Sequence, residues 1–108
     1  MANQSNIIFK TTDPEGRSIS LYKSTWEHIE ERHPEITSTG EIESTIIQPN
    51  IITQNLLKDS IIYSTIGRTV SYFNVIAKID DTYTEGFVIT SYLSNNIPKG
   101  NTIWIRKS

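Results

Sequence analysis

The sequence contains no cysteine. This absence excludes disulfide bonds, thiolate zinc sites, iron–sulfur clusters and a cysteine nucleophile. The two histidines are then the only strong nitrogen ligands for a metal. We therefore expect no thiol redox chemistry and no cofactor.

Long apolar runs are also missing. No stretch approaches the ~20 apolar residues that a membrane helix needs. Residues 1–6 show neither the basic region nor the hydrophobic region of a secretory signal. We expect no membrane contact and a cytoplasmic location.

Basic residues are too few to dominate the charge. Ten Lys and Arg stand against twelve Asp and Glu, which gives a net charge of −2 and a pI near 5.6. This balance excludes an overall positive field that would attract phosphate backbones. The acidic residues cluster within 27–43 and 80–85, so a local basic pocket could still form on another face.

The remaining composition is that of an ordinary globular protein, with 36% hydrophobic and 20% charged residues among 108. This length suits one domain with its own core and is too short for two. The sequence shows no internal repeat, linker or low-complexity tract. We expect residues 1–108 to form a single α+β domain.

Two parts of the chain have the composition of β-strands. Residues 7–10 and 19–23 flank the turn-forming Asp13-Pro14-Glu15-Gly16 and predict an N-terminal hairpin. β-branched and aromatic residues dominate after residue 50 and predict four strands, at 61–65, 69–79, 86–93 and 102–106. Short polar connectors join these four strands, which predicts a four-stranded antiparallel sheet.

Two helices are expected between the hairpin and that sheet. Ser24 precedes Glu27 by three residues, and Ser38 precedes Glu41 by the same interval. This is the spacing of a capping box, so each pair predicts the start of a helix. A proline closes each helix, at positions 34 and 49. The predicted fold is thus an N-terminal hairpin and two short helices packed on a four-stranded antiparallel sheet.

The first predicted helix carries the densest group of chemically useful side chains. His28, Arg32 and His33 lie within two turns, and the first two share a stripe because they are four residues apart. Cleavage of RNA without a metal requires a base for the 2′-OH, an acid for the leaving oxygen and a cation for the phosphate. Histidine and arginine can supply these groups near neutral pH, so we predict these three residues as catalytic.

Other roles for these residues stay open. His33 could pack beside Trp26 and stabilise the C-terminal end of the helix, while His28 and Arg32 could simply be solvated. Both histidines with Glu35 could hold a hydrolytic metal ion. However, a spacing of five residues places the two imidazoles about 140° apart on a helix, unlike the spacing of four in helical zinc motifs.

A second group lies on the predicted strands. Alternation directs Thr90 and Tyr92 to one face of their strand and Ser91 to the other. Aromatic and basic side chains on neighbouring strands are Tyr63, Arg68, Tyr72 and Lys78. Such groups could bind a phosphate or an unstacked base, so we predict Thr90 and Tyr92 as catalytic and the other four as substrate-binding. Alternatively, these residues serve strand pairing alone.

Several of these motifs together resemble a known nuclease superfamily. They are Trp26, His28-Ile29, Arg32-His33-Pro34-Glu35, Ile46-Ile47-x-Pro49 and Thr90-Ser91-Tyr92-Leu93. Over residues 18–105 the chain resembles the phage-type branch of the Barnase, EndoU, colicin and RelE-like (BECR) nucleases.

This resemblance implies N-terminal helices on a four-stranded antiparallel sheet and a toxin-type endoribonuclease that acts by 2′-OH attack without a metal. The helix histidine of the family matches His28, the basic pair matches Arg32 and His33, and the strand hydroxyls match Thr90 and Tyr92. The implied partners are an RNA substrate and a protein inhibitor or antitoxin. The acidic pI departs from the pattern of an RNA-cleaving toxin.

A non-catalytic module on the same fold is the alternative function. In that case the sheet edge and aromatic residues such as Tyr63, Tyr72 and Trp104 would contact a protein or an RNA. Convergence of the helix histidine and arginine with Thr90 and Tyr92 would favour the enzyme. The oligomeric state stays open.

Overall fold

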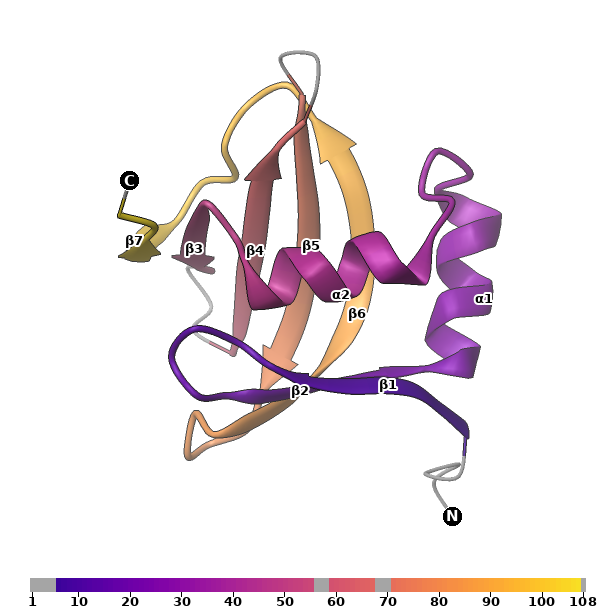
Figure 1. Cartoon of the computed structure of the whole chain (residues 1–108), viewed down its shortest axis with the longest axis horizontal. Coiled ribbons are helices and arrows are strands. Elements are labelled where there is room, and N and C mark those ends of the chain that lie inside the picture. Colours follow the sequence, from indigo (N-terminus) through magenta and orange to yellow (C-terminus); the bar gives the residue numbers. More distant parts are fainter. Residues whose placement is uncertain (1–5, 56–58, 68–70, 108) are drawn as a thin grey trace.

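The computed structural model describes residues 6–55, 59–67 and 71–107. Its elements are β1 (Ile7–Thr12), β2 (Ser18–Tyr22), α1 (Lys23–Arg32), α2 (Thr39–Ile47), β3 (Ile51–Gln54), β4 (Ser60–Ile66), β5 (Tyr72–Ile79), β6 (Glu85–Ser94) and β7 (Asn101–Ile105). These seven strands form one sheet in the order β1-β2-β6-β5-β4-β3-β7 (Figure 1). Neighbouring strands are antiparallel except β2 and β6, which are parallel.

The prediction of a four-stranded antiparallel sheet is therefore wrong, because the sheet has seven strands and is mixed. Strand β3, four residues long, lies between β4 and β7 and was not among the predicted strands. The hairpin was predicted to lie outside the sheet, whereas residues 18–20 of β2 pair with residues 85–87 of β6. Local propensity finds strands but carries no information on pairing between distant segments.

The two helices differ in how they begin. At α2, the Ser38 hydroxyl accepts hydrogen bonds from the backbone N–H groups of Gly40 and Glu41, as expected of an N-cap. At α1, the N-cap is Tyr22, which makes no side-chain cap, and Ser24 already lies within the helix. The predicted capping role of Ser24 is thus wrong. None of the helices in the described part of the chain is long and apolar enough to cross a membrane.

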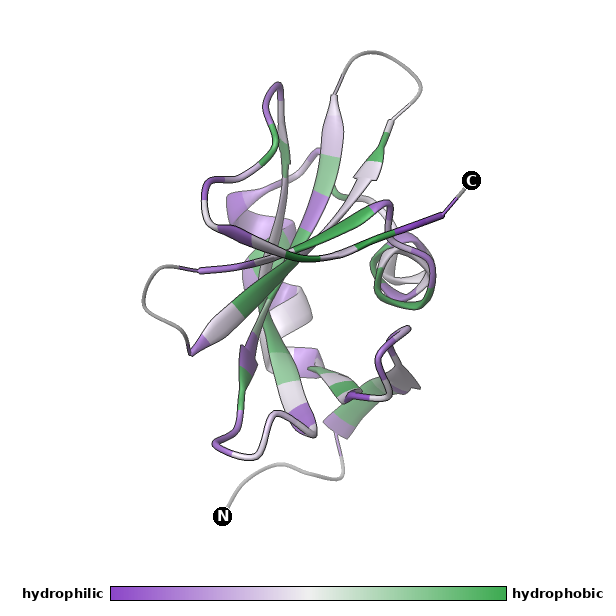
Figure 2. Ribbon diagram, turned by 90° about the vertical axis from the view of Figure 1, so that its left-hand side faces the viewer, coloured by the Kyte–Doolittle hydropathy of each residue, from purple (hydrophilic) through white to green (hydrophobic). Residues whose placement is uncertain are grey.

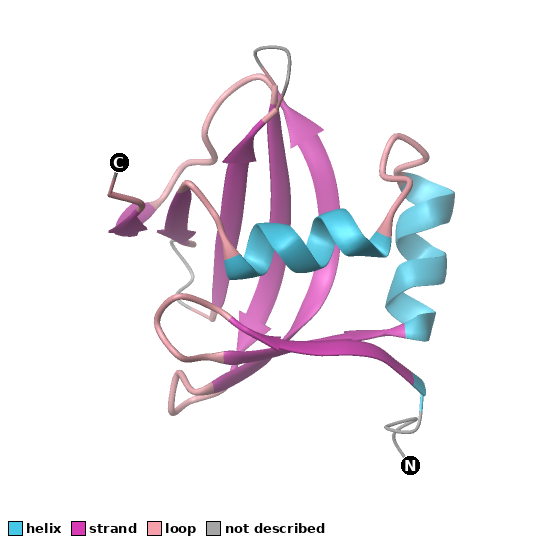
Figure 3. Ribbon diagram, viewed as in Figure 1, coloured by secondary structure: helices cyan, strands magenta, loops and turns pink. Residues whose placement is uncertain are grey.

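The core lies between the sheet and the two helices. Helix α2 crosses one face of the sheet, and α1 stands beside β6 (Figures 1 and 3). Ile29 of α1 and Ile42 and Ile46 of α2 are fully buried, as are Val75 and Val88 of the sheet. Burial of each such side chain contributes about 1.5–3 kcal/mol. Figure 2 shows the hydrophobic and hydrophilic residues interleaved along the twisted strands.

The pairing of β5 with β6 defines two faces. Phe73, Val75 and Ala77 are buried on the face that α2 covers. The residues that alternate with them, and their partners on β6, lie on the opposite face, which we call the outer face. On β5 and β6 it comprises Tyr72, Asn74, Ile76, Lys78, Phe87, Thr90, Tyr92 and Ser94.

A register irregularity in this pair affects the outer face. Thr90 pairs with Ile76, but Val88 already pairs with Ala77, so Ile89 is an extra residue in β6. Such a bulge shifts the alternation by one position. Phe87 and Thr90 therefore share the outer face although they are three residues apart.

Candidate functional site

Four of the predicted site residues lie together on the outer face. Thr90 and Tyr92 come from β6, and Tyr72 and Lys78 come from the neighbouring strand β5. Their side chains range from half-buried to exposed. The structure thus places hydroxyl, aromatic and basic groups on one accessible surface.

Two further predicted residues do not join them. Tyr63 pairs with Val75 on the α2-covered face, has no exposed surface, and donates a hydrogen bond of 2.6 Å to the Asp13 carboxylate. Arg68 lies outside the described residues. Trp104, considered above for a binding module, packs against the core beside β3.

Of the three residues predicted as catalytic around the first helix, His33 is the one that contacts a predicted strand residue, Tyr92. His33 follows the last residue of α1 as the C-cap, and its backbone N–H donates to the Ile29 carbonyl. Its ring centroid lies 6.3 Å from that of Tyr92, with the planes tilted by 41°. Its Nδ1 lies 3.4 Å from Oε2 of Glu35. His33 therefore lies beside both a carboxylate and the Tyr92 ring.

Tyr92 is suited to donate a hydrogen bond at this position. Burial raises the pKa of the Tyr92 hydroxyl above its ordinary value. A phenol with a raised pKa stays neutral at physiological pH and keeps its proton. Tyr92 can therefore act as a hydrogen-bond donor but not as a phenolate base.

His28 and Arg32 do not converge on the same point. Both side chains are exposed on α1, and neither forms a hydrogen bond or ion pair with another described residue. Residues 28 and 33 are separated by about 140° of helix rotation, which directs their side chains differently. The predicted cluster of two histidines and an arginine is thus divided, and only His33 contacts Tyr92.

A polar network around the buried Asn74 lies beside Tyr92 on the neighbouring strand. The Asn74 side chain accepts a hydrogen bond of 2.7 Å from Ser64 and donates one of 2.9 Å to Ser94. It also donates to the backbone carbonyl of Tyr92, and the Ser91 hydroxyl donates to the carbonyl of Asn74. Asn74 was not among the predicted site residues. An asparagine inside a β-branched run is disfavoured, and that signal could have identified it.

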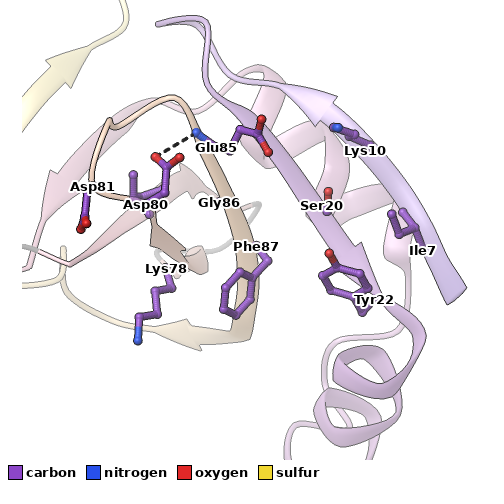
Figure 4. Close-up of a pocket in the computed structure, with 11 residues that line it drawn as sticks. Ile7, Lys10, Ser20, Tyr22, Lys78, Asp80, Asp81, Glu85, Gly86 and Phe87 are labelled. Atoms are coloured by element: carbon purple, nitrogen blue, oxygen red, sulfur yellow. Dashed lines mark hydrogen bonds between the residues drawn. The ribbon is translucent and has the colours of Figure 1, made fainter. Parts of the chain in front are cut away.

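The outer face is hollowed where the hairpin joins the sheet. A pocket of about 590 Å³ lies there between β1, β2, β5 and β6 (Figure 4). We call it the Phe87 groove, because the Phe87 ring stands in it with 41% of its surface exposed. The Tyr22 ring approaches it edge-on, with centroids 6.4 Å apart. The remaining lining consists of Ile7, Lys10, Ser20, Lys78, Ile79, Asp80, Asp81, Glu85 and Gly86.

Acidic residues occupy one end of the Phe87 groove, at the turn between β5 and β6. Desolvation raises the pKa of Asp80, but hydrogen bonds from the N–H groups of Glu85 and Thr84 outweigh it and hold that pKa below its ordinary value. A further hydrogen bond comes from Thr82. The Asp80 carboxylate thus stabilises the turn between β5 and β6 by accepting these hydrogen bonds.

The described residues were also considered as ligands for a metal ion. Within residues 6–55, 59–67 and 71–107, no three His, Asp or Glu side chains are placed to hold a metal ion. Glu35 lies beside His33 alone, and His28 does not join them.

Comparison with protein-family models, with curated proteins and with solved structures finds no match. The resemblance to the BECR nucleases therefore stays a prediction that rests on the short motifs quoted above.

Proposed function

We propose that this protein binds single-stranded RNA on the outer face and cleaves it without a metal, by attack of a 2′-OH beside His33 and Tyr92. The observation that carries the proposal is the contact between these two rings, with the Glu35 carboxylate 3.4 Å from Nδ1 of the imidazole. A carboxylate at one ring nitrogen orients an imidazole and leaves the other nitrogen for proton transfer.

The reaction follows from these groups. His33 accepts the proton of the ribose 2′-OH, and the 2′ oxygen attacks the adjacent phosphorus. The bond from phosphorus to the 5′ oxygen breaks, and that oxygen takes up a proton from solvent, to which His33 afterwards returns the proton that it accepted. Tyr92 donates a hydrogen bond to the phosphoryl oxygens, where negative charge develops. The products are a 2′,3′-cyclic phosphate and a 5′-hydroxyl.

The exposed helix residues have a different role in this proposal. Arg32 directly precedes His33, and its guanidinium can pair with a phosphate of the bound strand. His28, which is exposed on α1, contacts the same RNA strand outside the reacting centre. A cytoplasmic location and a protein inhibitor or antitoxin belong to the same proposal, because a cell that makes an RNA-cleaving toxin must be protected from it.

Cleavage of a single-stranded RNA by the purified chain, with a chelator present, tests the proposal. We expect products that end in a 2′,3′-cyclic phosphate and no cleavage of the matching DNA. His33→Ala should lower the cleavage rate at least about 100-fold, since general acid–base catalysis contributes about that much. Tyr92→Phe should lower it less, and both variants should fold.

His28→Ala is the matched comparison, because it removes the other histidine of the same helix. We expect it to weaken RNA binding slightly and to leave the rate at saturating RNA close to that of the wild type. If His28→Ala abolishes cleavage and His33→Ala does not, the assignment to His33 is wrong.

Binding of RNA without cleavage is the second candidate function. The observation that favours it is that His28 and Arg32 do not reach the His33–Tyr92 pair, so one imidazole stands alone there. In that case RNA binds the outer face, yet no cleavage is detected with the chain in excess.

A further inference from the structure

Four side chains form a row across the outer face, one from each of four adjacent strands. Lys10 of β1 pairs with Ser20 of β2, Ser20 pairs with Phe87 of β6, and Phe87 pairs with Lys78 of β5. Paired residues project to the same face, and adjacent strands lie about 4.8 Å apart. The backbones at the two lysines are thus about 14 Å apart, with Phe87 between them.

The Phe87 groove offers a flat aromatic surface with space above it. Ser20 is small and lies next to the Phe87 ring, and Tyr22 closes that side with its ring edge (Figure 4). Lys78 lies on the other side of Phe87 (Figure 4). The volume of about 590 Å³ falls within the range of small-ligand pockets.

The acidic residues of the Phe87 groove are gathered at one of its ends. Asp80, Asp81 and Glu85 lie at the end formed by the β5–β6 turn and repel phosphates from it. In the opposite direction, the outer face continues along β6 from Phe87 to Thr90 and Tyr92. Phe87 and Tyr92 are about 15 Å apart along the strand. An anionic chain that crosses the strands over the lysines is therefore repelled from the β5–β6 turn. To reach Tyr92 and His33 it must bend and follow β6 away from that turn.

We propose that the Phe87 groove is a base-binding subsite for single-stranded RNA. One unstacked base lies on the Phe87 ring, and Lys10 and Lys78 pair with the phosphates on either side of it. Aromatic rings and flanking cations are the groups that hold single strands without base pairing. The course of the strand from here to His33 rests on the proposed function, whereas binding at Phe87 does not require cleavage.

The test measures binding of a short, fluorescently labelled 2′-O-methyl oligonucleotide, which lacks the 2′-OH and cannot be cleaved by 2′-OH attack. Phe87→Ala should weaken binding at least about fivefold, because stacking on an aromatic ring contributes that much per base. Phe87→Leu keeps an apolar side chain and should weaken it comparably. Ile105→Ala is the matched control, since Ile105 is also exposed but lies on β7. It should bind like the wild type.

The lysines are tested through the dependence of affinity on salt. Lys10→Ala and Lys78→Ala should each make the slope of log affinity against log salt shallower by about 0.7, the value for one phosphate contact on a single strand. Lys107→Ala, an exposed control near the C-terminal end, should leave the slope unchanged.

The outcomes separate this inference from the proposed function. Wild-type affinity in folded Phe87→Leu, or no binding of the oligonucleotide by the wild type, overturns the subsite. A protein that cleaves RNA through His33 while both Phe87 variants bind normally keeps its proposed function and loses the subsite. A protein that never cleaves RNA but needs Phe87 for binding keeps the subsite and loses the proposed cleavage.

Discussion

Tyr63 links the N-terminal hairpin to the middle of the sheet. Its hydroxyl donates to the Asp13 carboxylate, which also pairs with Arg17 at 2.9 Å and accepts the backbone N–H groups of Glu15 and Arg17. Both Tyr63 and the Asp13 side chain are buried. A buried carboxylate that loses a partner is strongly destabilising, so this group holds the turn of the hairpin against β4.

We predict that Tyr63→Phe lowers the free energy of unfolding by about 1–3 kcal/mol. This is the usual cost, about 1–3 kcal/mol, of leaving a buried hydrogen-bonding group, here the Asp13 carboxylate, without one of its partners. Urea denaturation followed by circular dichroism measures the change. Tyr72→Phe is the control, because Tyr72 is only partly buried and its hydroxyl has no hydrogen-bond partner among the described residues. An equal loss in both variants would contradict the role given to Asp13.

Tyr63 should also make the stability of the folded protein depend on pH. Burial, reinforced by the hydrogen bond to Asp13, raises the pKa of Tyr63 well above its ordinary value. The folded protein then keeps a proton that the unfolded chain releases above about pH 10. Stability should be unaffected by Tyr63 below that pH and should fall as the pH rises above it. Unfolding measured between pH 8 and 11.5 should show a shallower decline in Tyr63→Phe.

At the scale of elements, the two helix starts show that one sequence spacing can have two outcomes. Ser38 caps α2, whereas Ser24 lies inside α1, because the chain leaves β2 directly into the helix at Lys23. The pairing of β2 determines where that strand ends. The N-cap position of α1 is therefore Tyr22, which has no short side-chain oxygen to accept from the first backbone N–H groups.

This difference is measurable by alanine substitution. Ser38→Ala should destabilise the protein by about 1 kcal/mol, the usual value of an N-cap. Ser24→Ala should change the stability much less, because it removes no cap and alanine favours a helix. The melting temperatures of both variants, measured by thermal denaturation, test this difference. Equal melting temperatures would show that Ser38 does not stabilise α2.

At the scale of the whole molecule, the parallel contact between β2 and β6 joins the hairpin to the rest of the sheet. Gly86 pairs with Ile19 of β2 at this contact and with Ile79 of β5 on its other side. A Cβ at Gly86 would stand 2.4 Å from the Lys78 carbonyl oxygen and 2.7 Å from Cδ1 of Ile79, both on β5, and 3.3 Å from Cδ1 of Ile19. No side chain fits at these distances unless the backbone moves. The Phe87 groove, which crosses the same contact, depends on this close approach.

Gly86→Ala should therefore destabilise the protein by about 1–3 kcal/mol, the range for overpacking. Gly40→Ala serves as the comparison, because its nearest neighbour is the Ser38 hydroxyl at 3.3 Å and alanine is favoured in a helix. Chemical denaturation of both variants is the measurement. A fully stable Gly86→Ala protein would argue against the close packing of β6 on β5 at this position.

Much of the local structure could be predicted from the residues alone. The turn at Asp13–Gly16, the cap at Ser38 and the alternation that sets Thr90 and Tyr92 apart from Ser91 all follow from short-range chemistry. The site was harder to predict. Alternation could not distinguish Tyr63, buried against Asp13, from Tyr72 on the outer face, because it states which residues share a face and not what covers that face.

The sequence by itself determined where the chain turns, where α2 begins and which neighbouring side chains project together, since these depend on backbone sterics within a few residues. Only the tertiary structure decided that the hairpin pairs with β6, that β3 separates β4 from β7, and that His33 rather than His28 meets Tyr92. These outcomes depend on contacts between distant segments. The free energy of such contacts comes from burial in the assembled core and is not encoded in any single stretch of residues.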